Sequence, residues 1–268
     1  MDICAALQKN IPLKKVLVMK DDPVRSVDRA FAILNCFTLD KPRLSLTAIT
    51  EAIDLPATTA LRIVTTLTKL GMLKKHSDRS YTLGNGVFLL GAVAKAHFRP
   101  QQIAQYYMQQ LRDDTKEAVS LYGMDKEDRV CYAHMPSLLT MRCVVRIGDR
   151  FPLWAGAGGK CILAYADKKT IEREAAKLHA ITSSTIKDRE TLLADLAEIR
   201  TRDYAISLGE REDGILSVAV PIFDKTKRAA FSLSIAAPAT RLGDDAIQEL
   251  VPRMQEMCTR ISQQLFFI

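Results

Sequence analysis

Threonine and arginine recur at helical spacing in residues 57–69, ATTALRIVTTLTK. Arg62 falls opposite the apolar stripe of this pattern, where a guanidinium can bond guanine O6 and N7 together or bind a phosphate. Thr58 and Thr59, at the start of the segment, can donate to phosphate or touch a thymine methyl group, and Thr65 shares their face. The pattern therefore predicts a helix whose outward face contacts DNA.

A leucine and a basic hairpin complete this candidate DNA surface. We expect Leu61 to be buried, and contact with a thymine methyl group is the alternative. Two short strand-like runs flank the polar turn Ser77–Ser80 and carry Lys74, Lys75 and Arg79. These cations can hold backbone phosphates, which adds affinity but little sequence information. The alternative is an ordinary solvated hairpin.

Three helical segments must position these side chains. We expect Ser26 to cap the first helix and Ser45 to cap the second, which ends before Pro56. The third runs over Pro56–Lys69 and ends at Gly71, which tolerates the left-handed conformation. Its expected buried stripe is Ala60, Ile63, Val64, Leu67 and Leu70. Helix-turn-helix pairs also occur in ordinary bundles, but the Thr/Arg face and the basic hairpin favour a winged helix-turn-helix over residues 24–86.

The remainder of the chain mixes strands and helices. Residues 87–100 are apolar at helical spacing and predict a linker helix that Arg99-Pro100 ends. Over residues 101–268 the expected strands are Ala118–Tyr122, Val130–His134, Thr140–Val145, Leu216–Ile222 and Ala229–Ala236. The expected helices, besides one resuming at Ile103, are Gly158–Ala166, Lys168–Leu178, Arg189–Arg202 and Asp244–Gln264. This order predicts a second domain of α/β (α+β) class.

A glycine-rich run, Trp154–Lys160, opens one of these helices. Small residues let backbone N–H groups approach a ligand, and a helix start favours an anion. The run lacks the spacing of a Walker A loop, because the first required glycine would fall at Trp154. The alternative is a tight turn beneath a helix.

Charge is divided unevenly along the 268 residues, whose net charge is +7. Residues 1–100 hold 15 Lys and Arg against 8 Asp and Glu, whereas residues 101–268 hold 23 of each. A basic segment joined to a neutral one indicates a polyanion-binding module attached to another kind of domain, although a merely basic tail is an alternative. Residues 1–23 match a secretory signal poorly and are expected to be a leader without regular structure; translation could start at Met1 or Met19.

The cysteines and histidines give little support to a metal site or an enzyme. The six cysteines are scattered without a CxxC motif, which favours reduced, mostly buried thiols in an intracellular protein. Cys131, His134 and Cys143 have spacing that a metal could use, but core cysteines are the preferred interpretation. No GxSxG, HExxH or GxGxxG motif after a strand is present. We expect no metal, no cofactor, no membrane span and a cytoplasmic location.

Five segments, in order, resemble the IclR family of bacterial transcriptional regulators. They are VRSVDRAFAILNCF, LPATTALRIVTTLTKLGML, YTLGNGVFLLG, RIGDRFPLWAGAGGKCILA, and EREDGILSVAVPIFD followed by FSLSIAAPATRL. The resemblance extends from Val24 to the C-terminal helix. It implies a winged helix-turn-helix domain, a GAF-like effector domain on a curved antiparallel sheet, and dimers through the DNA-binding domain, commonly paired into tetramers.

The resemblance also implies an effector pocket for a small organic acid. Backbone groups of Ala157 and Gly158 are expected to bind its carboxylate, and Trp154 to form an aromatic wall. The other expected pocket residues are Cys143, Ser207, Ser217 and Ser234. Ser207 stands where several relatives have Asp, and Ala236 where some have Ser. These differences favour a larger or partly apolar acid, with aromatic acids among the candidates and core serines as the alternative.

Together these features predict a DNA-binding transcriptional regulator controlled by an organic acid. We expect a repressor that binds a pseudo-palindromic operator as a homodimer or homotetramer. An activator of the same family is the first alternative. An enzyme, or a ligand-sensing module without DNA binding, is a more distant one.

Overall fold

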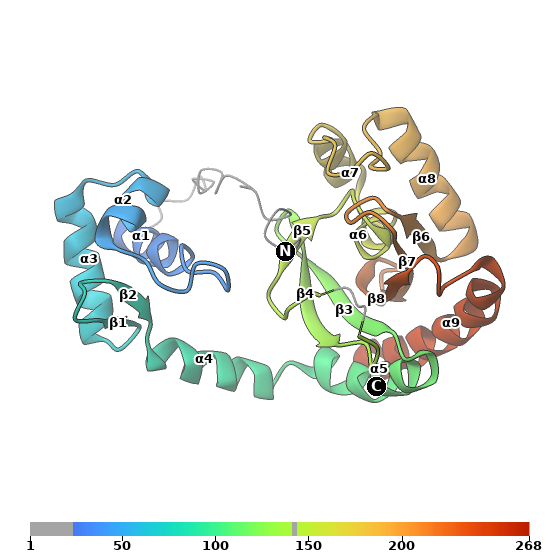
Figure 1. Ribbon diagram of the computed structural model, residues 1–268, viewed down its shortest axis with the longest axis horizontal. Coiled ribbons are helices and arrows are strands. Elements are labelled where there is room, and N and C mark those ends of the chain that lie inside the picture. The colour runs from blue at the N-terminus through green and yellow to red at the C-terminus, as the bar shows by residue number, and fades with distance from the viewer. Residues whose placement is uncertain (1–23, 141–143, 268) are drawn as a thin grey trace. The chain divides into compact units, whose positions relative to one another are not determined.

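The computed structural model describes residues 24–140 and 144–267, and the chain separates into two compact units, Met1–His97 and Phe98–Ile268 (Figure 1). The division falls within the predicted linker segment, residues 87–100. The expected leader, residues 1–23, and Cys143 lie outside the described residues.

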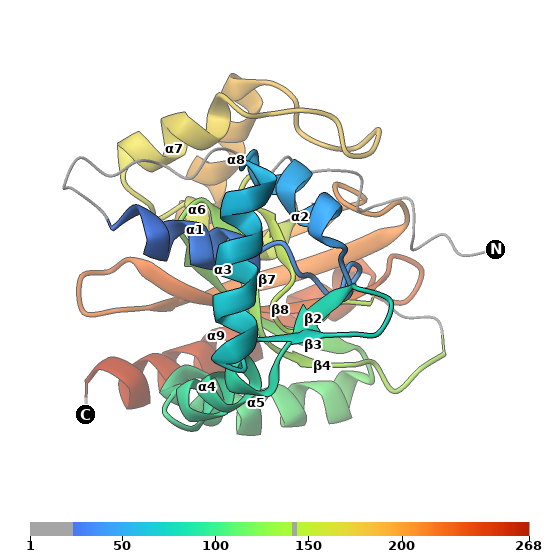
Figure 2. The same ribbon diagram turned by 90° about the vertical axis from the view of Figure 1, so that its left-hand side faces the viewer.

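The first unit is a three-helix domain with a short hairpin and a following helix. Its elements are α1 (Arg25–Leu34), α2 (Leu46–Ile53), α3 (Ala57–Lys69), β1 (Leu73–Lys75), β2 (Tyr81–Leu83) and α4 (Asn85–Ala96). Figure 2 shows α3 along the side of this unit, with α2 beside it, α1 behind it and the hairpin near its end. The winged helix-turn-helix predicted from the sequence is confirmed.

Five of the six elements contribute to the core of this unit, and α4 has no buried residue. The core includes Ile33, Ile49, Val64, Leu73 and Tyr81, which are all buried. Ser45 Oγ accepts the N–H of Ala48 at 3.1 Å, so the predicted cap of α2 is confirmed. The predicted cap of α1 is wrong, because Val24 occupies the cap position and no side chain caps the helix. Among the described helices of this unit, α2 is the one whose start is capped by a side-chain hydroxyl.

The third helix ends at Lys69 as predicted, but its buried stripe is shorter than the apolar pattern implied. Ala60, Val64 and Leu67 are buried, but Leu70 is 65% exposed, so the expectation of its burial is wrong. The helix ends at Lys69, and the chain reverses at Gly71, whose φ is +71°. Because the reversal carries Leu73 into the core instead, Leu70 is left outside.

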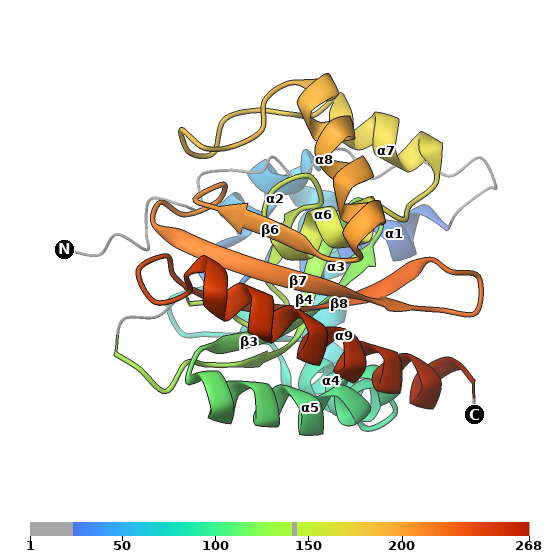
Figure 3. The same ribbon diagram turned by 90° about the vertical axis from the view of Figure 1, so that its right-hand side faces the viewer.

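The second unit is a six-stranded antiparallel sheet with helices on both faces (Figure 3). Its strands are β3 (Ala118–Asp125), β4 (Asp128–Met135), β5 (Arg150–Pro152), β6 (Ala205–Leu208), β7 (Ile215–Phe223) and β8 (Ala229–Pro238), in the spatial order β5-β4-β3-β8-β7-β6. Its helices are α5 (Arg99–Thr115), α6 (Ala157–Leu163), α7 (Lys168–Ala175), α8 (Arg189–Arg202) and α9 (Asp244–Phe266). The predicted α/β class is confirmed.

Each face of the sheet has its own core. Leu121, Val218 and Ile235 point to the face covered by α5 and α9, together with Met108 and Met254 from those helices. The opposite face packs against α6 and α8 through a second set of buried residues, which includes Tyr122, Leu163, Leu192, Leu196 and Ala219. Successive strand residues alternate between the two cores, as the two-residue period of a strand requires.

Several predicted boundaries differ from the structure. Arg99-Pro100 begins α5 rather than ending the helix before it, because proline is well tolerated in a first helical turn. No strand is formed at Thr140 or Val144–Val145, the described parts of one predicted strand. The short strands β5 and β6 were not predicted.

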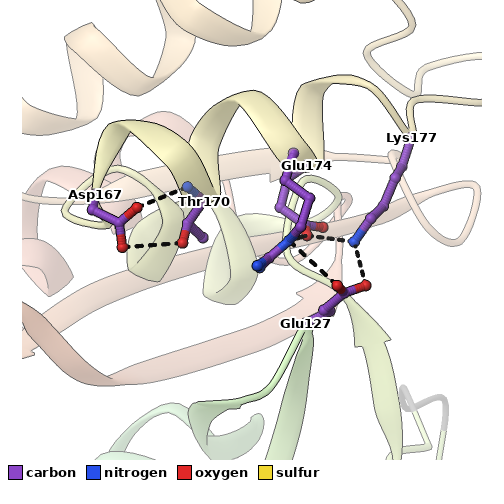
Figure 4. A network of polar contacts seen from close by, with 6 residues as sticks. Glu127, Asp167, Thr170, Glu174 and Lys177 are labelled. Atoms are coloured by element: carbon purple, nitrogen blue, oxygen red, sulfur yellow. Dashed lines mark hydrogen bonds and ion pairs between the residues drawn. The ribbon is translucent and has the colours of Figure 1, made fainter. Parts of the chain in front are cut away.

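A polar cluster fastens α7 to the turn between β3 and β4 (Figure 4). The Lys177 ammonium lies 2.9 Å from Glu127 Oε2 and 2.6 Å from Glu174 Oε1. The carboxylate of Asp167 accepts the N–H of Thr170 at 2.8 Å and so caps the start of the helix. The hydrogen bonds that Asp167 accepts from the N–H and the hydroxyl of Thr170 lower the pKa of Asp167. The cluster links two elements that flank the glycine-rich run.

Candidate functional site

The outward face of α3 presents the side chains predicted to contact DNA. Arg62, Thr58 and Thr65 are exposed, whereas Thr59 is half-buried. Leu61 is 46% exposed, so the expectation that it would be buried is wrong. The buried stripe of the helix consists of Ala60, Val64 and Leu67, and Leu61 lies at the edge of this stripe. Leu61 therefore presents an apolar surface beside the Arg62 guanidinium.

The hairpin after α3 carries three exposed cations, on Lys74, Lys75 and Arg79. Its two strands pair antiparallel, with Lys74 opposite Thr82 and Lys75 opposite Tyr81. Arg79 adopts a left-handed conformation, with a φ of +63°. The basic turn is thus a defined structure rather than a loose loop.

Asp78 fixes the shape of that turn. Its Oδ1 accepts hydrogen bonds from the backbone N–H of Ser80 at 3.1 Å and from the Ser80 hydroxyl at 2.6 Å. Arg43 lies 3.5 Å from the other carboxylate oxygen. The hydrogen bonds from Ser80 lower the pKa of Asp78, so the carboxylate remains charged at neutral pH.

A cavity of about 40 Å³ lies in the second unit, on the sheet face that carries α6. Of the residues predicted to form an effector pocket, three line it: Ser207, Ser217 and Ser234. Gly156, from the glycine-rich run, lines it as well. The predicted pocket and the cavity therefore share the sheet floor and the edge of the loop.

Serines from four strands make up that floor. Ser207 on β6 pairs directly with Ser217 on β7, and Ser234 on β8 pairs with Ser120 on β3. Ser120 Oγ lies 2.9 Å from Nδ1 of His134, which extends the polar floor onto β4. The register of the sheet thus gathers hydroxyl groups that lie more than a hundred residues apart in the sequence.

The glycine-rich loop contributes differently from what the sequence suggested. The backbone N–H of Gly156, the residue before α6, donates to Oε2 of Glu210 at 2.9 Å. The N–H of Ala157 donates to Ser217 Oγ at 3.4 Å. Ala157 and Gly158 are buried and are not part of the cavity wall. A Cβ on Gly158 would lie 2.8 Å from the Tyr122 ring, so the backbone packs closely against that side chain.

Trp154 does not line the cavity either. Its side chain is 1% exposed and lies in the core beneath α6 and α8. Its ring packs edge-on against His179, with centroids 4.9 Å apart. The chain turns inward between β5 and α6, which directs the indole into the core rather than toward a ligand.

A buried ion cluster lies directly behind the loop. The ammonium of Lys160 contacts Oε1 of Glu210 and lies 2.8 Å from Oδ2 of Asp195. Only 2% of the Lys160 side chain and 7% of the Glu210 side chain are exposed. Thr185 Oγ1 also donates to the Glu210 carbonyl at 2.7 Å. Glu210 therefore joins the loop after β6 to the start of α6.

Two arginines that sequence reasoning missed also line the cavity, Arg129 and Arg211. The guanidinium carbon of Arg129 lies 4.5 Å from the ring centroid of Tyr122 and 5.0 Å from that of Phe151. The Arg211 guanidinium carbon lies 3.7 Å from the Phe151 centroid. No local motif marks these residues, because the fold brings them together from β4 and from the loop before β7.

Burial governs the titratable groups on this side of the sheet. Burial raises the pKa of the Tyr122 hydroxyl, against the opposing influence of Arg129. It also raises the pKa of the Cys131 thiol to about 12. Cys131 lies in the core while His134 lies at the cavity. Within residues 24–140 and 144–267, no group of three or more His, Cys, Asp or Glu side chains could hold a metal ion.

No helix in the described part of the chain is long and apolar enough to cross a membrane.

Comparisons with known proteins find matches for both units of the chain. Residues 26–77 match the IclR helix-turn-helix domain, and residues 94–263 match the C-terminal domain of the bacterial transcriptional regulator IclR. The chain is 30% identical to the HTH-type transcriptional regulator KdgR of Escherichia coli over 91% of this chain and 94% of the relative. It is 26% identical to the acetate operon repressor of Salmonella typhimurium, with 85% of each chain covered.

A solved IclR transcriptional regulator from Alicyclobacillus acidocaldarius has a similar structure. It superposes with a TM-score of 0.81 at 28% identity, covering 90% of this chain and 98% of that one. The likeness spans both units of the chain.

Proposed function

This chain belongs to the IclR family of bacterial transcriptional regulators, and we propose that it is a repressor whose hold on a pseudo-palindromic operator is controlled by a small organic acid. It is a DNA-binding regulator and not an enzyme. In the proposal, the first unit binds DNA in the cytoplasm and the second unit binds the effector. The name of the Salmonella typhimurium relative supports the repressor role.

The observation that carries the proposal is the outward face of α3. Arg62 is exposed on the second helix of a helix-turn-helix pair, where such helices meet base edges. Leu61 beside it offers apolar contact to a thymine methyl group. Lys74, Lys75 and Arg79 supply phosphate contacts from the hairpin. The helix would read the sequence, and the hairpin would add salt-dependent affinity.

An apolar face on α4 supports a homodimer. Leu89, Leu90 and Val93 are 54%, 62% and 63% exposed, and their spacing places them on one side of the helix. An exposed apolar stripe of this kind is characteristic of a protein interface. Pairing two copies through the first unit would present two α3 helices to two half-sites, and pairs of dimers would make a tetramer.

The cavity of the second unit is the proposed effector site. Its floor of serines and its arginines suit an organic acid better than a neutral apolar molecule. The effector acts on DNA binding only if it binds the DNA-competent and DNA-incompetent states with different affinity. In a repressor, it would bind the incompetent state more tightly.

The test is fluorescence anisotropy of the full-length protein on labelled DNA from its own upstream intergenic region, at two salt concentrations. We expect tight, salt-sensitive binding to this DNA over a scrambled duplex, and its loss in Arg62→Ala. Equal weak binding to both duplexes would contradict an operator in that region. An in vitro transcription assay then separates the alternatives, because a repressor lowers transcript yield and an activator raises it.

The proposed dimer is tested by sedimentation velocity on Leu89→Asp/Val93→Asp. We expect the variant to sediment as a smaller species and to bind the operator more weakly. A control variant, Lys95→Ala, alters the same helix outside the apolar face and should change neither quantity. An unchanged sedimentation coefficient in the double variant would contradict an α4 interface.

A further inference from the structure

Arg211 stands out among the residues around the cavity. It lies in the loop between β6 and β7, between Gly209 and Gly214, both of which have positive φ angles. Its guanidinium stacks on Phe151, and its aliphatic stem lies against Gly156, where an added Cβ would come within 3.1 Å of Arg211 Cδ. Stacking and packing together hold the planar guanidinium at the cavity wall.

No described residue supplies an acceptor for this cation. Among the described residues, the Arg211 guanidinium makes no hydrogen bond and no ion pair. The buried carboxylate of the adjacent residue, Glu210, is already engaged by Gly156 N–H and by Lys160. Arg211 lines the cavity together with Glu210 and Glu212, and no described carboxylate is paired with its five N–H donors. A planar guanidinium of this kind can bind a carboxylate with two parallel hydrogen bonds.

The rest of the cavity wall is rich in hydroxyl groups. Ser207, Ser217, Ser234 and the Ser120–His134 pair supply donors and acceptors across the floor. Trp154, expected to be an aromatic wall, is absent from it. The volume of about 40 Å³ leaves room for few atoms. These features favour a short ligand with oxygen atoms along its length, rather than an aromatic ring or an alkyl chain.

We infer that Arg211 binds the carboxylate of the effector, and that the effector is a short hydroxy- or oxo-acid whose remaining oxygens contact the serine floor. This inference rests on the proposed function, since it assigns the chemistry of the same cavity. It replaces the sequence-based preference for a larger or partly apolar acid. It also assigns anion binding to a side chain, whereas the sequence assigned it to the amides of Ala157 and Gly158.

The inference is tested by isothermal titration calorimetry of the full-length protein with pyruvate, L-lactate, D-glycerate and 4-hydroxybenzoate. Pyruvamide is the uncharged comparison for pyruvate. The variants are Arg211→Gln, which removes the charge, and Arg211→Lys, which keeps the charge but not the paired donors. Arg228→Gln is the matched control, because Arg228 is exposed in the β7–β8 turn of the same unit and away from the cavity lining.

We expect at least one of the three hydroxy- or oxo-acids to bind more tightly than 4-hydroxybenzoate, and pyruvamide to bind more weakly than pyruvate. Arg211→Gln should weaken the affinity for the acid by about 10- to 100-fold, which corresponds to the usual contribution of a hydrogen bond to a charged group. Arg211→Lys should fall between, and Arg228→Gln should match the wild type. Thermal melting verifies that each variant is folded. If Arg211→Gln is not folded, the comparison of the wild type with Arg211→Lys decides the test.

Two results would overturn the inference: equal affinity in wild type and Arg211→Gln, or tightest binding of 4-hydroxybenzoate. A third result separates the two proposals. If an acid binds and releases the operator, and its binding is lost in Ser217→Ala but not in Arg211→Gln, the proposed function stands and only the role of Arg211 fails. If none of the four acids binds, the inference fails together with the proposal of an acid effector, while operator binding still stands by its own assay.

Discussion

The carboxylate of Glu210 accepts a hydrogen bond from the backbone N–H of Gly156 at 2.9 Å, across 54 residues of sequence. The same carboxylate contacts the buried ammonium of Lys160. One side chain therefore holds the start of α6 against the loop that carries Arg211. The link joins two parts of the cavity wall, and it gives the first prediction.

Glu210→Gln should destabilise the protein by about 3–5 kcal/mol, because it leaves the Lys160 charge buried without its closest partner. Chemical denaturation followed by circular dichroism measures the loss. Glu256→Gln is the control, since its ion pair with Arg260 is 65% and 60% exposed; it should cost less than about 0.5 kcal/mol. Equal effects of the two substitutions would contradict a structural role for the buried pair.

Arg79→Gly separates the charge of the hairpin from its backbone shape. The φ of +63° at Arg79 suits glycine, so stability should be unchanged or rise by up to about 1 kcal/mol. Loss of one phosphate contact should reduce the log–log salt slope of operator binding by about 0.9 for each hairpin in contact. Anisotropy titrations over a salt series measure the slope, and Arg79→Lys should restore it. A wild-type slope in Arg79→Gly would mean that Arg79 touches no phosphate.

Two glycines should respond in opposite directions to alanine. A Cβ on Gly159 would lie 2.5 Å from the Leu153 carbonyl oxygen, so Gly159→Ala should destabilise the second unit by about 1–3 kcal/mol. Gly91, within α4, has nothing within 4 Å of a Cβ, and Gly91→Ala should stabilise that helix by about 0.5–1 kcal/mol. Differential scanning calorimetry compares the two. Similar melting temperatures would argue against the close approach of α6 to Leu153.

The described thiols should be unreactive in the folded protein. Cys36, Cys131, Cys161 and Cys258 are all buried, and burial raises the pKa of each, that of Cys131 to about 12. At pH 8 these four should react with Ellman's reagent only after unfolding. Rapid modification of the Cys131 peptide, identified by mass spectrometry without denaturant, would contradict its burial.

The same shifts give a pH dependence of stability. A thiol whose pKa is higher in the folded than in the unfolded protein stabilises the fold fully at pH values below the unfolded pKa. That stabilisation is lost as the pH rises through the folded pKa. The pKa of cysteine in an unfolded chain is about 8.5. The melting temperature should therefore fall as the pH rises from about 9 toward 12, and it should fall less in Cys131→Ala. Parallel curves for the two proteins would contradict the raised pKa.

The first unit could be predicted closely because its signals are local. Ser45, Pro56 and Gly71 mark helix boundaries within a few residues of the side chains they position, and the buried positions follow helical spacing. The errors at Leu61 and Leu70 lie at the border of the apolar stripe. There, periodicity does not decide which side of the helix the neighbouring elements cover.

The cavity could be predicted only in part because it is assembled from distant segments. The resemblance to known regulators supplied Ser207, Ser217 and Ser234, which do line it. Arg129 and Arg211 lie in no motif, and their placement depends on how β4 and the loop before β7 are brought together. The strands β5 and β6, of three and four residues, are too short to show a strand period in the sequence.

The alternation along the strands has a consequence for how this regulator can change its chemical preference. Ser217 faces the cavity, while its neighbours Leu216 and Val218 lie in the core beneath α9. Ser234 stands in the same way between Leu233 and Ile235. The cavity floor and the core beneath α9 therefore lie on opposite faces of the same strands, and the floor shares its own face with the core beneath α6 and α8. In the proposed effector site, substitution of one floor residue can change which acid is bound while the packing beneath α9 is left intact.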